Sequence, residues 1–393
     1  MKEANRLMAE GKSSEALEAL DRLLATSPDN LVALYNRGLA HQRLERWPAA
    51  EADYRRVLAE RPDDLQAVVN LTSVLRAQGK LAEAETRLRT ELESNPFEPA
   101  LLNSLAIILR QRQAFDEAER VARKVLMRDE RNVDAHKNLA AVAQDRGQLR
   151  LAESLWRSAQ QWAEAEGRTD ADILVNLGLI YRLLGDPSRA ASAFQAAVAM
   201  DEDHLEANFN LGSLALAHRD YDRAAGAYAR LARRFPESAE MAAYLGFSYQ
   251  GQRRLPDAVK ALERARALYQ KTPSGDDDQV LFQLMVVSSE AGQLEKALTY
   301  AREIQARKNI ECGPEDYDGF CGRLKGIELQ IEMSEGPSGG PAGGNGAAGG
   351  NEAARGSGIP DQGPSSEPGP QTVLPDRNAE SGRASFENAS GDA

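Results

Sequence analysis

Five asparagines occur at equivalent positions of a repeating pattern between residues 36 and 210. They are Asn36, Asn70, Asn138, Asn176 and Asn210. A side-chain amide both donates and accepts hydrogen bonds, so a row of amides can bind the backbone of an extended peptide. The row is broken once, where Ser104 occupies the equivalent position beside Asn103. A second interpretation is that these amides bond to neighbouring helices and serve the fold.

Aromatic and cationic side chains are expected on the same face as the asparagines. The predicted apolar anchors are Tyr35, Phe209, Phe247 and Phe282, and the predicted carboxylate partners are Arg43, Arg76, Arg110 and Arg182. Aromatic anchors and charge-assisted arginine bonds supply much of the energy of protein recognition. Acidic residues form a neighbouring stripe toward the C-terminus, at Asp134, Asp172, Glu206 and Glu240. The alternative is that all these charges are solvated surface groups.

The elements that carry these residues repeat along the chain. Alanines mark the repeat at 16, 50, 84, 118 and 152, then after one longer step at 190, 224 and 258, and after a second longer step at 297. Most intervals are 34 residues, and the two longer steps, of 38 and 39 residues, are predicted to contain loop insertions. Twelve residues before the alanine, most copies have a second small residue, such as Gly38, Gly178 or Gly212. A fixed period of this length indicates one helical unit copied along the chain.

Proline ends several copies twelve residues after the alanine, for example Pro28 and Pro62. The combined pattern resembles the tetratricopeptide repeat family over residues 1–311. The resemblance implies nine repeats in an all-α, right-handed superhelical solenoid with a concave groove, toward which the asparagine stripe would face. The stripe is also similar to the asparagines of the repeat region of O-linked N-acetylglucosamine transferases, which hold peptide backbone; the catalytic domain of those enzymes is absent.

Two further segments follow the predicted repeats. Residues 312–333 are predicted to form a loop and a capping helix from about Phe320 to Met333. Residues 334–393 contain 14 glycines and 7 prolines and are predicted to form a disordered tail, because they can bury little apolar surface.

The composition limits the partners and the compartment. The net charge of −12 argues against nucleic acid, and no apolar run is long enough to span a membrane. As the sequence stands it predicts a cytoplasmic protein. Met1 falls inside the first predicted helix, however, so a lost upstream signal would place the protein in a bacterial cell envelope. Cys312 and Cys321 could form a disulfide in an oxidising compartment, although reduced cysteines are equally consistent with the sequence.

No phosphate-binding glycine loop, metal-binding histidine pair or nucleophile motif is present, so neither an enzyme nor a cofactor is predicted. A carboxylate clamp of the co-chaperone type is rejected because Gln66 and Asn70 stand where cations are required.

The leading hypothesis is a noncatalytic scaffold that binds extended segments of other proteins in its groove. The alternatives are an envelope assembly protein for gliding motility, pili or secretion, and a targeting subunit for a separate enzyme such as a glycosyltransferase. An exposed end at the first repeat would also permit self-association.

Overall fold

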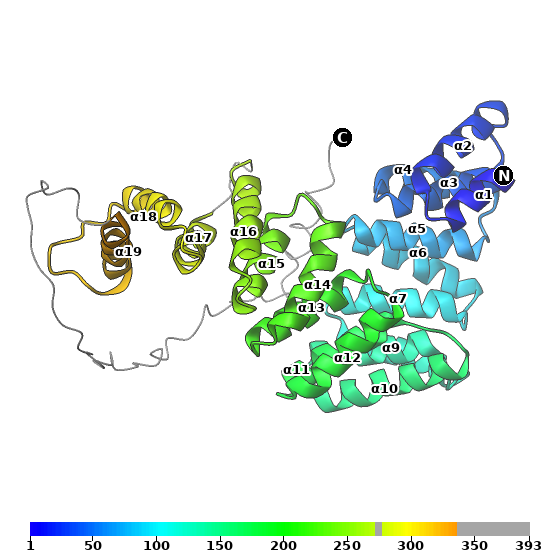
Figure 1. Cartoon of the computed structure of the whole chain (residues 1–393). Helices are drawn as coiled ribbons and strands as arrows, with labels where there is room; N and C mark the ends of the chain where they lie inside the picture. The colour runs from blue at the N-terminus through cyan, green and yellow to red at the C-terminus, as the bar shows by residue number, and fades with distance from the viewer. Residues whose placement is uncertain (272–276, 336–393) are drawn as a thin grey trace, which may run out of the picture. The chain divides into compact units, whose positions relative to one another are not determined.

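The computed structural model describes residues 1–271 and 277–335 (Figure 1). These residues form nineteen α-helices and no strand, which confirms the predicted all-α repeat fold. They divide into two compact units, Met1–Ala207 (unit 1) and the residues from Asn208 onward (unit 2). The tail predicted for residues 334–393 lies outside the described residues apart from its first two.

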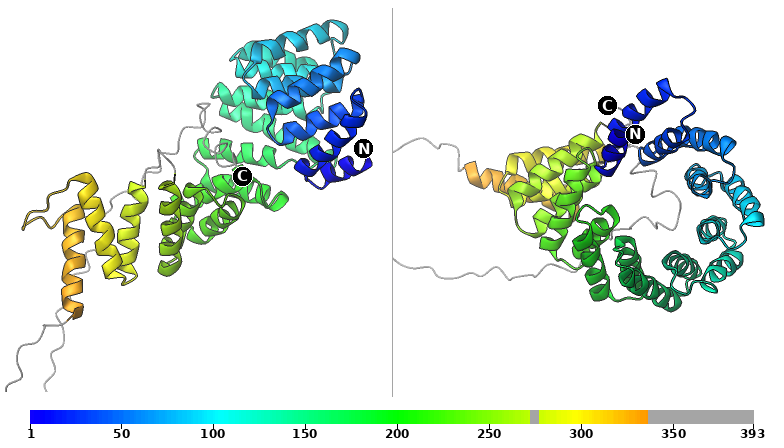
Figure 2. Two further views of the ribbon diagram at one scale, coloured as in Figure 1. Left: turned by 90° about the horizontal axis from the view of Figure 1, so that it is seen from above. Right: turned by 90° about the vertical axis from the view of Figure 1, so that its right-hand side faces the viewer.

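Unit 1 consists of consecutive helix pairs, and each pair is one repeat. Its helices are α1 Lys2–Ala9, α2 Ser13–Thr26, α3 Leu31–Arg43, α4 Trp47–Glu60, α5 Leu65–Ala77, α6 Leu81–Ser94, α7 Pro99–Gln111, α8 Phe115–Leu126, α9 Val133–Asp145, α10 Leu149–Ala165, α11 Ala171–Leu183 and α12 Pro187–Met200. The odd-numbered helices are the first helices of the repeats and the even-numbered helices are the second. First helices also contact one another between repeats, α3 with α5, α5 with α7 and α7 with α9. Such contacts are expected on the inner side of the curved path that Figure 2 shows for the helix pairs of unit 1.

Unit 2 continues the same pattern. After α13, Leu205–Ala217, which begins in unit 1, its helices are α14 Tyr221–Arg234, α15 Ala239–Gly251, α16 Leu255–Tyr269, α17 Asp278–Glu290, α18 Leu294–Lys308 and α19 Gly319–Glu335. The last helix therefore extends two residues beyond the predicted end of the capping segment.

The repeating alanines and glycines lie where the two helices of a repeat meet. All nine repeating alanines are completely buried, at 0% exposure. The small residue of the first helix packs against a large side chain of the second: Gly38 against Tyr54, Gly178 against Phe194 and Gly212 against Tyr228. A Cβ atom at Gly178 would lie 2.5 Å from Phe194 Cε1, closer than van der Waals contact allows. The small residues are thus required by the aromatic rings opposite them.

Each repeat turns between its two helices at a residue with positive φ. This residue stands five positions before the repeating alanine and is glycine in five copies, including Gly79 and Gly147. Side chains are present in the other four, at Glu45, Gln113, Arg219 and Arg253, with φ between 57° and 61°. A left-handed residue after a helix satisfies its last carbonyl groups, and glycine adopts that conformation most easily.

Side-chain caps begin several of the first helices. The Oδ1 atoms of Asn30, Asp64 and Asn132 accept hydrogen bonds from backbone N–H groups three residues later, at 3.0, 3.0 and 3.1 Å. These caps satisfy donors that the helix itself leaves unpaired.

The prediction that the 38-residue step contains a loop insertion is largely wrong. Helix α10 has 17 residues where α4 and α6 have 14, and the connection that follows it gains only one residue. Ala163 is buried near the end of the extended helix, so the added residues, which make up less than one turn, are held by packing. The second longer step falls partly on residues 272–276, outside the described residues.

Candidate functional site

The asparagine row lies on the first helices, and its amide nitrogens make bonds within the protein. Asn36 Nδ2 lies 3.4 Å from Asn5 Oδ1, and Asn70 Nδ2 donates to the Tyr35 hydroxyl at 2.8 Å. Each of these partners belongs to the first helix of the preceding repeat. The Asn176 nitrogen instead donates to the Asp172 carbonyl one turn earlier in its own helix, at 2.8 Å.

Asn138 is the most strongly held member of the row. It is buried, and its Nδ2 lies 3.2 Å from the carbonyl oxygen and 3.3 Å from the Oδ1 of Asn103. Asn103 in turn donates to Oδ1 of the capping residue Asn132 at 3.1 Å. Asn103 therefore connects two repeats at the point where the row itself contains Ser104. The sequence-based alternative, in which the amides bond to neighbouring helices, describes Asn70 and Asn138 well.

The amide oxygens of the row take part in fewer hydrogen bonds within the protein than the amide nitrogens do. In the described part of the chain, Oδ1 of Asn36, Asn138 and Asn176 accepts no hydrogen bond from another residue. The side chains of Asn36 and Asn176 are half-buried. Asn36 and Asn176 therefore each keep an acceptor oxygen and a second amide hydrogen that a peptide backbone could use. Asn210, the fifth member, belongs to unit 2 and is also half-buried.

Two of the four predicted aromatic anchors, Tyr35 and Phe209, are packed against other rings. Tyr35 meets the Tyr54 ring edge-on, with centroids 5.7 Å apart, and burial raises the pKa of its hydroxyl. Phe209 makes edge contacts with Tyr228 and Tyr244 in unit 2, at 6.4 and 6.2 Å. Both anchors remain half-buried, so each could offer a ligand only part of its ring.

The predicted arginines differ in how they are engaged. Arg110 pairs with Asp145 of the next first helix at 2.9 Å, and Arg43 donates to the Met8 carbonyl at 2.6 Å. Arg76 and Arg182 occupy α5 and α11 and are half-buried, and burial lowers the pKa of the Arg182 guanidinium. A ligand carboxylate would have to displace Asp145 to reach Arg110.

A second row of charged residues, which the sequence analysis missed, runs along the second helices. A glutamate directly after the repeating alanine is paired with an arginine four residues later and with a cation of the next repeat. The glutamates are Glu51, Glu85, Glu119 and Glu153, and the two partners of each are Arg55 and Lys80, Arg89 and Arg112, Arg123 and Arg146, and Arg157 and Arg189. We call this set the glutamate row. The 34-residue spacing of the glutamates was a signal that could have identified it.

Burial and charge act against each other in the glutamate row. Burial would raise the pKa of Glu85, but hydrogen bonds from Arg89 and Arg112 lower it below its ordinary value. Burial would likewise raise the pKa of Glu51, but hydrogen bonds from Lys80 and Gln78 lower it below its ordinary value. Glu51 and Glu85 are therefore ionised links between repeats.

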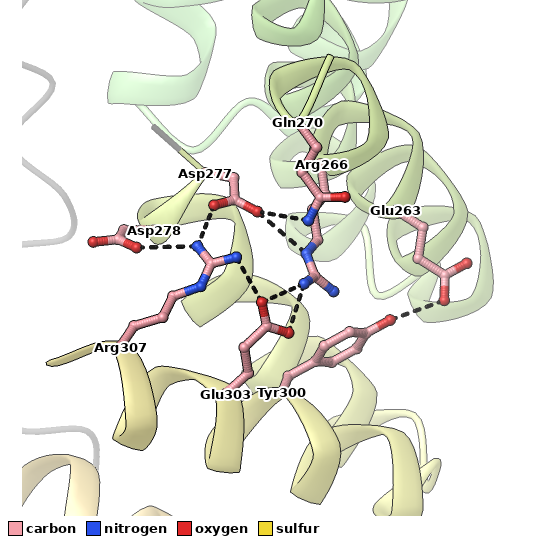
Figure 3. Close-up of polar contacts among 8 residues, drawn as sticks. All are labelled: Glu263, Arg266, Gln270, Asp277, Asp278, Tyr300, Glu303 and Arg307. Atoms are coloured by element: carbon pink, nitrogen blue, oxygen red, sulfur yellow. Dashed lines mark hydrogen bonds and ion pairs between the residues drawn. The ribbon is translucent and has the colours of Figure 1, made fainter. Parts of the chain in front are cut away.

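Unit 2 contains a compact network of ion pairs between α16, α17 and α18 (Figure 3). Arg266 Nε lies 3.2 Å from Asp277 Oδ2, and its Nη2 lies 2.5 Å from Glu303 Oε1. Arg307 contacts both Asp277 and Glu303. Asp277 is only 5% exposed; burial would raise its pKa, but the bonds from Arg307 and Arg266 lower it. The geometry joins three helices and leaves the charges mutually paired, which is typical of a structural network.

The two cysteines lie in the segment after α18. The structure joins Cys312 and Cys321 in a disulfide, with their Cα atoms 5.5 Å apart. Cys321 is buried on α19, and Lys325 of the same helix donates to the Gly313 carbonyl at 2.6 Å. The bond and this contact both hold the loop against the last helix.

Within the described ranges, no helix is long and apolar enough to cross a membrane. No group of three histidine, cysteine, aspartate or glutamate side chains in those ranges is placed to hold a metal ion.

Antiparallel helix pairs stacked at a 34-residue interval define an α-solenoid repeat protein. Profiles of the tetratricopeptide repeat family match residues 4–71, residues 71–135, 175–239 and 209–273, and residues 132–203. The chain therefore belongs to the tetratricopeptide repeat family, whose fold typically serves as a noncatalytic scaffold for protein interactions.

Solved structures of tetratricopeptide repeat proteins are similar to this chain in fold. One is a tetratricopeptide repeat protein from Parabacteroides merdae, with 20% identity, coverage of 63% of this chain and 96% of the other, and a TM-score of 0.48. PilW, a type IV pilus biogenesis factor, has 22% identity, coverage of 50% and 90%, and a TM-score of 0.43. The APC/C hetero-tetramer Cut9-Hcn1 has 18% identity, coverage of 80% and 58%, and a TM-score of 0.45. Among curated proteins, none matches the sequence.

Proposed function

We propose that this protein is a scaffold whose first helices bind extended segments of partner proteins. The observation that supports this most directly is the set of amide oxygens on Asn36, Asn138 and Asn176, which accept no bond from other described residues. Asn138 and Asn176 lie on the first helices of successive repeats, and Asn36 lies on the first helix three repeats before Asn138. An extended peptide offers N–H donors along its length that such oxygens could accept. Backbone recognition of this kind would tolerate many partner sequences.

The strength of such binding has a limit. Hydrogen bonds contribute a net ~1 kcal/mol each, so the four rungs of unit 1 would supply about 4 kcal/mol. Micromolar affinity requires about 8 kcal/mol. The remainder must come from side chains, for which Tyr35, Arg76 and Arg182 are the proposed contacts in unit 1, and Phe209 with Asn210 in unit 2.

The test compares proteins captured from the native host by the full chain and by an Asn36→Ala, Asn176→Ala variant. These two residues are chosen because their nitrogens make a long contact or a local bond, so folding should survive, as circular dichroism would verify. We expect capture to fall for the variant and to persist for a control, Asn95→Ala, at the end of α6. Equal capture by the folded variant and the wild type would refute the proposal.

A second candidate, an assembly protein of a bacterial cell envelope, is favoured by the Cys312–Cys321 disulfide, because disulfides persist in oxidising compartments. Alkylation of free thiols in intact host cells, followed by mass spectrometry, tests it. Alkylated cysteines would reject the envelope assignment, and a disulfide-linked peptide would support it. The third candidate, a targeting subunit for a glycosyltransferase, rests on the asparagine row alone.

A further inference from the structure

The fourth member of the glutamate row lies in a cleft with an excess of positive charge. Three arginines contact the buried Glu153: Arg150 at 3.1 Å, Arg157 at 2.9 Å and Arg189 at 3.0 Å. The cleft has a volume of about 530 Å³ and is also lined by Ser154 and Ser158. All of its lining residues belong to α10 and α12, two second helices of unit 1, so the cleft is separate from the asparagine row.

The clusters of charges around the first three glutamates of the row are each neutral overall, whereas the cluster around Glu153 is not. At Glu51 the cations Arg55 and Lys80 face two carboxylates, since Arg55 also pairs with Glu83. At Glu85 the second carboxylate is Glu117, which pairs with Arg89 at 2.7 Å.

At Glu119 the second carboxylate is Asp116, which pairs with Arg146. Each of these three clusters therefore has two cations and two carboxylates.

At Glu153 the count differs because two positions that hold a carboxylate in earlier clusters hold an arginine. One of them is Arg150, which stands three residues before Glu153 as Asp116 stands before Glu119. Glu83 and Glu117 directly precede a repeating alanine, and the residue in that position before Ala190 is Arg189. Arg150 adds a third cation, and the only other carboxylate that pairs with these arginines in the described residues is Asp186, at 2.7 Å from Arg189. Three cations then face two carboxylates.

The arginines are oriented but still accessible. Arg157 lies 3.2 Å from the Tyr181 hydroxyl, and the Arg189 guanidinium stacks over the Tyr181 ring at 4.5 Å. The side chains of Arg150, Arg157 and Arg189 are 74%, 54% and 41% exposed, whereas that of Glu153 is 8% exposed. Guanidinium groups held in this way are preorganised for an oxyanion, with which they can form two parallel bonds.

We propose that this cleft binds a side-chain carboxylate from an acidic segment of a partner protein. That carboxylate would neutralise the excess charge, because three cations would then face three carboxylates. The volume exceeds that of a single carboxylate and leaves room for neighbouring peptide atoms. The serine hydroxyls beside the arginines supply further polar contacts for them.

The probe for the test is a fluorescein-labelled synthetic peptide of alternating glutamate and serine, titrated against the full-length protein by fluorescence anisotropy. The same peptide with glutamine in place of glutamate measures the contribution of the carboxylates. We expect the glutamate peptide to bind more tightly, with an affinity that falls as salt is added.

Three variants locate the binding. Arg150→Gln should weaken the glutamate peptide about tenfold, as expected for one charge-assisted bond. Arg189→Glu leaves two cations facing three carboxylates and should abolish binding. Arg123→Gln is the matched control, because Arg123 is an exposed partner of Glu119 in a neutral cluster, and it should bind as the wild type does. Circular dichroism verifies that each variant is folded.

The proposal fails if the glutamate and glutamine peptides bind equally, or if Arg150→Gln and Arg123→Gln behave alike. A phosphoserine version of the glutamine peptide tests the competing chemistry. Binding of that peptide without binding of the glutamate peptide would overturn the carboxylate assignment. Because the variants lie on second helices, their outcome is independent of the asparagine variants on the first helices.

Discussion

At the scale of single residues, the small positions of the repeat are explained by the side chain that faces each one. Gly212 packs against the fully buried Tyr228, and an added Cβ would lie 2.8 Å from the Tyr228 ring. We expect Gly212→Ala to cost about 1–3 kcal/mol, because neither the ring nor the helix can move freely. Chemical denaturation monitored by circular dichroism measures the change.

Gly226, in the middle of α14, is the matched control for Gly212→Ala. Its nearest neighbour to an added Cβ is the end of the Arg230 side chain, at 3.9 Å. Gly226→Ala should therefore stabilise the protein by about 0.5–1 kcal/mol, the usual helix preference for alanine over glycine. Equal effects of the two substitutions would show that close packing is not the reason for the small residue.

Single residues also show how much of the site could be predicted from the sequence. The alanine and glycine periods predicted which positions would be buried, because burial follows the helical repeat directly. They could not predict that Asn70 would bond to Tyr35 and Asn138 to Asn103. Those bonds depend on side-chain rotamers and on the distance between adjacent first helices, neither of which the spacing of residues specifies.

At the level of the helix pair, the turn is strained in the four repeats whose positive-φ residue carries a side chain. Gln113 adopts φ 61° in this turn, a conformation that costs a residue with a side chain roughly 1–2 kcal/mol. Gln113→Gly would remove this strain, but glycine loses more conformational entropy on folding, which offsets part of the benefit. The net effect should be a stabilisation of the protein by about 0.5–1 kcal/mol. The midpoint of urea denaturation provides the measurement.

Gly147 occupies the same turn in the next repeat, and Gly147→Ala is the reciprocal change. An added Cβ there meets no atom within 4 Å, so any effect must come from the backbone. We expect Gly147→Ala to lower the free energy of unfolding by about 1 kcal/mol. If both substitutions destabilised the protein, the turn would not be under the strain described.

Contacts between successive repeats depend on pH through the glutamate row. The pKa of Glu85 is lowered in the folded protein from its ordinary value of 4.5, so folding favours the ionised form. Its contribution to stability is therefore complete well above pH 4.5 and is lost as the pH falls below that value. Denaturation midpoints of wild type and Glu85→Gln, measured between about pH 7 and pH 3, should converge on acidification. A difference that stays constant over this range would show that Glu85 titrates alike in both states.

The sequence predicted the helix pairs well and the links between them poorly. Pairing follows from the small residues, which recur without exception in the second helix. The glutamate row depends instead on long side chains reaching across a repeat, and its second cation stands 27 residues after Glu85 and Glu119 but 29 after Glu51 and 36 after Glu153. The regular spacing of the glutamates therefore indicates a row, but the irregular spacing of the second cations hides which cation pairs with each glutamate.

At the scale of the whole molecule, repeats that contact only their neighbours should transmit disturbance over short distances. Two buried carboxylates in different units allow a direct comparison. Asp53 accepts two bonds from Arg37, at 2.6 and 2.8 Å, and Asp277 accepts bonds from Arg266 and Arg307. Arg37→Ala would leave Asp53 buried without its charge partner, a change that typically costs about 3–5 kcal/mol. Asp277→Ala would leave two arginines in unit 2 without their shared carboxylate.

Hydrogen exchange measured by mass spectrometry distinguishes local from global effects of these two variants. Arg37→Ala should accelerate exchange in α2, α3 and α4 while α16 to α18 keep wild-type protection. Asp277→Ala should produce the opposite pattern, with faster exchange in α16 to α18 alone. Faster exchange throughout the chain in either variant would mean that the repeats unfold as one cooperative body. The local outcome has a functional consequence, because a partner bound to a few repeats would then stabilise those repeats and leave the others free to bind independently.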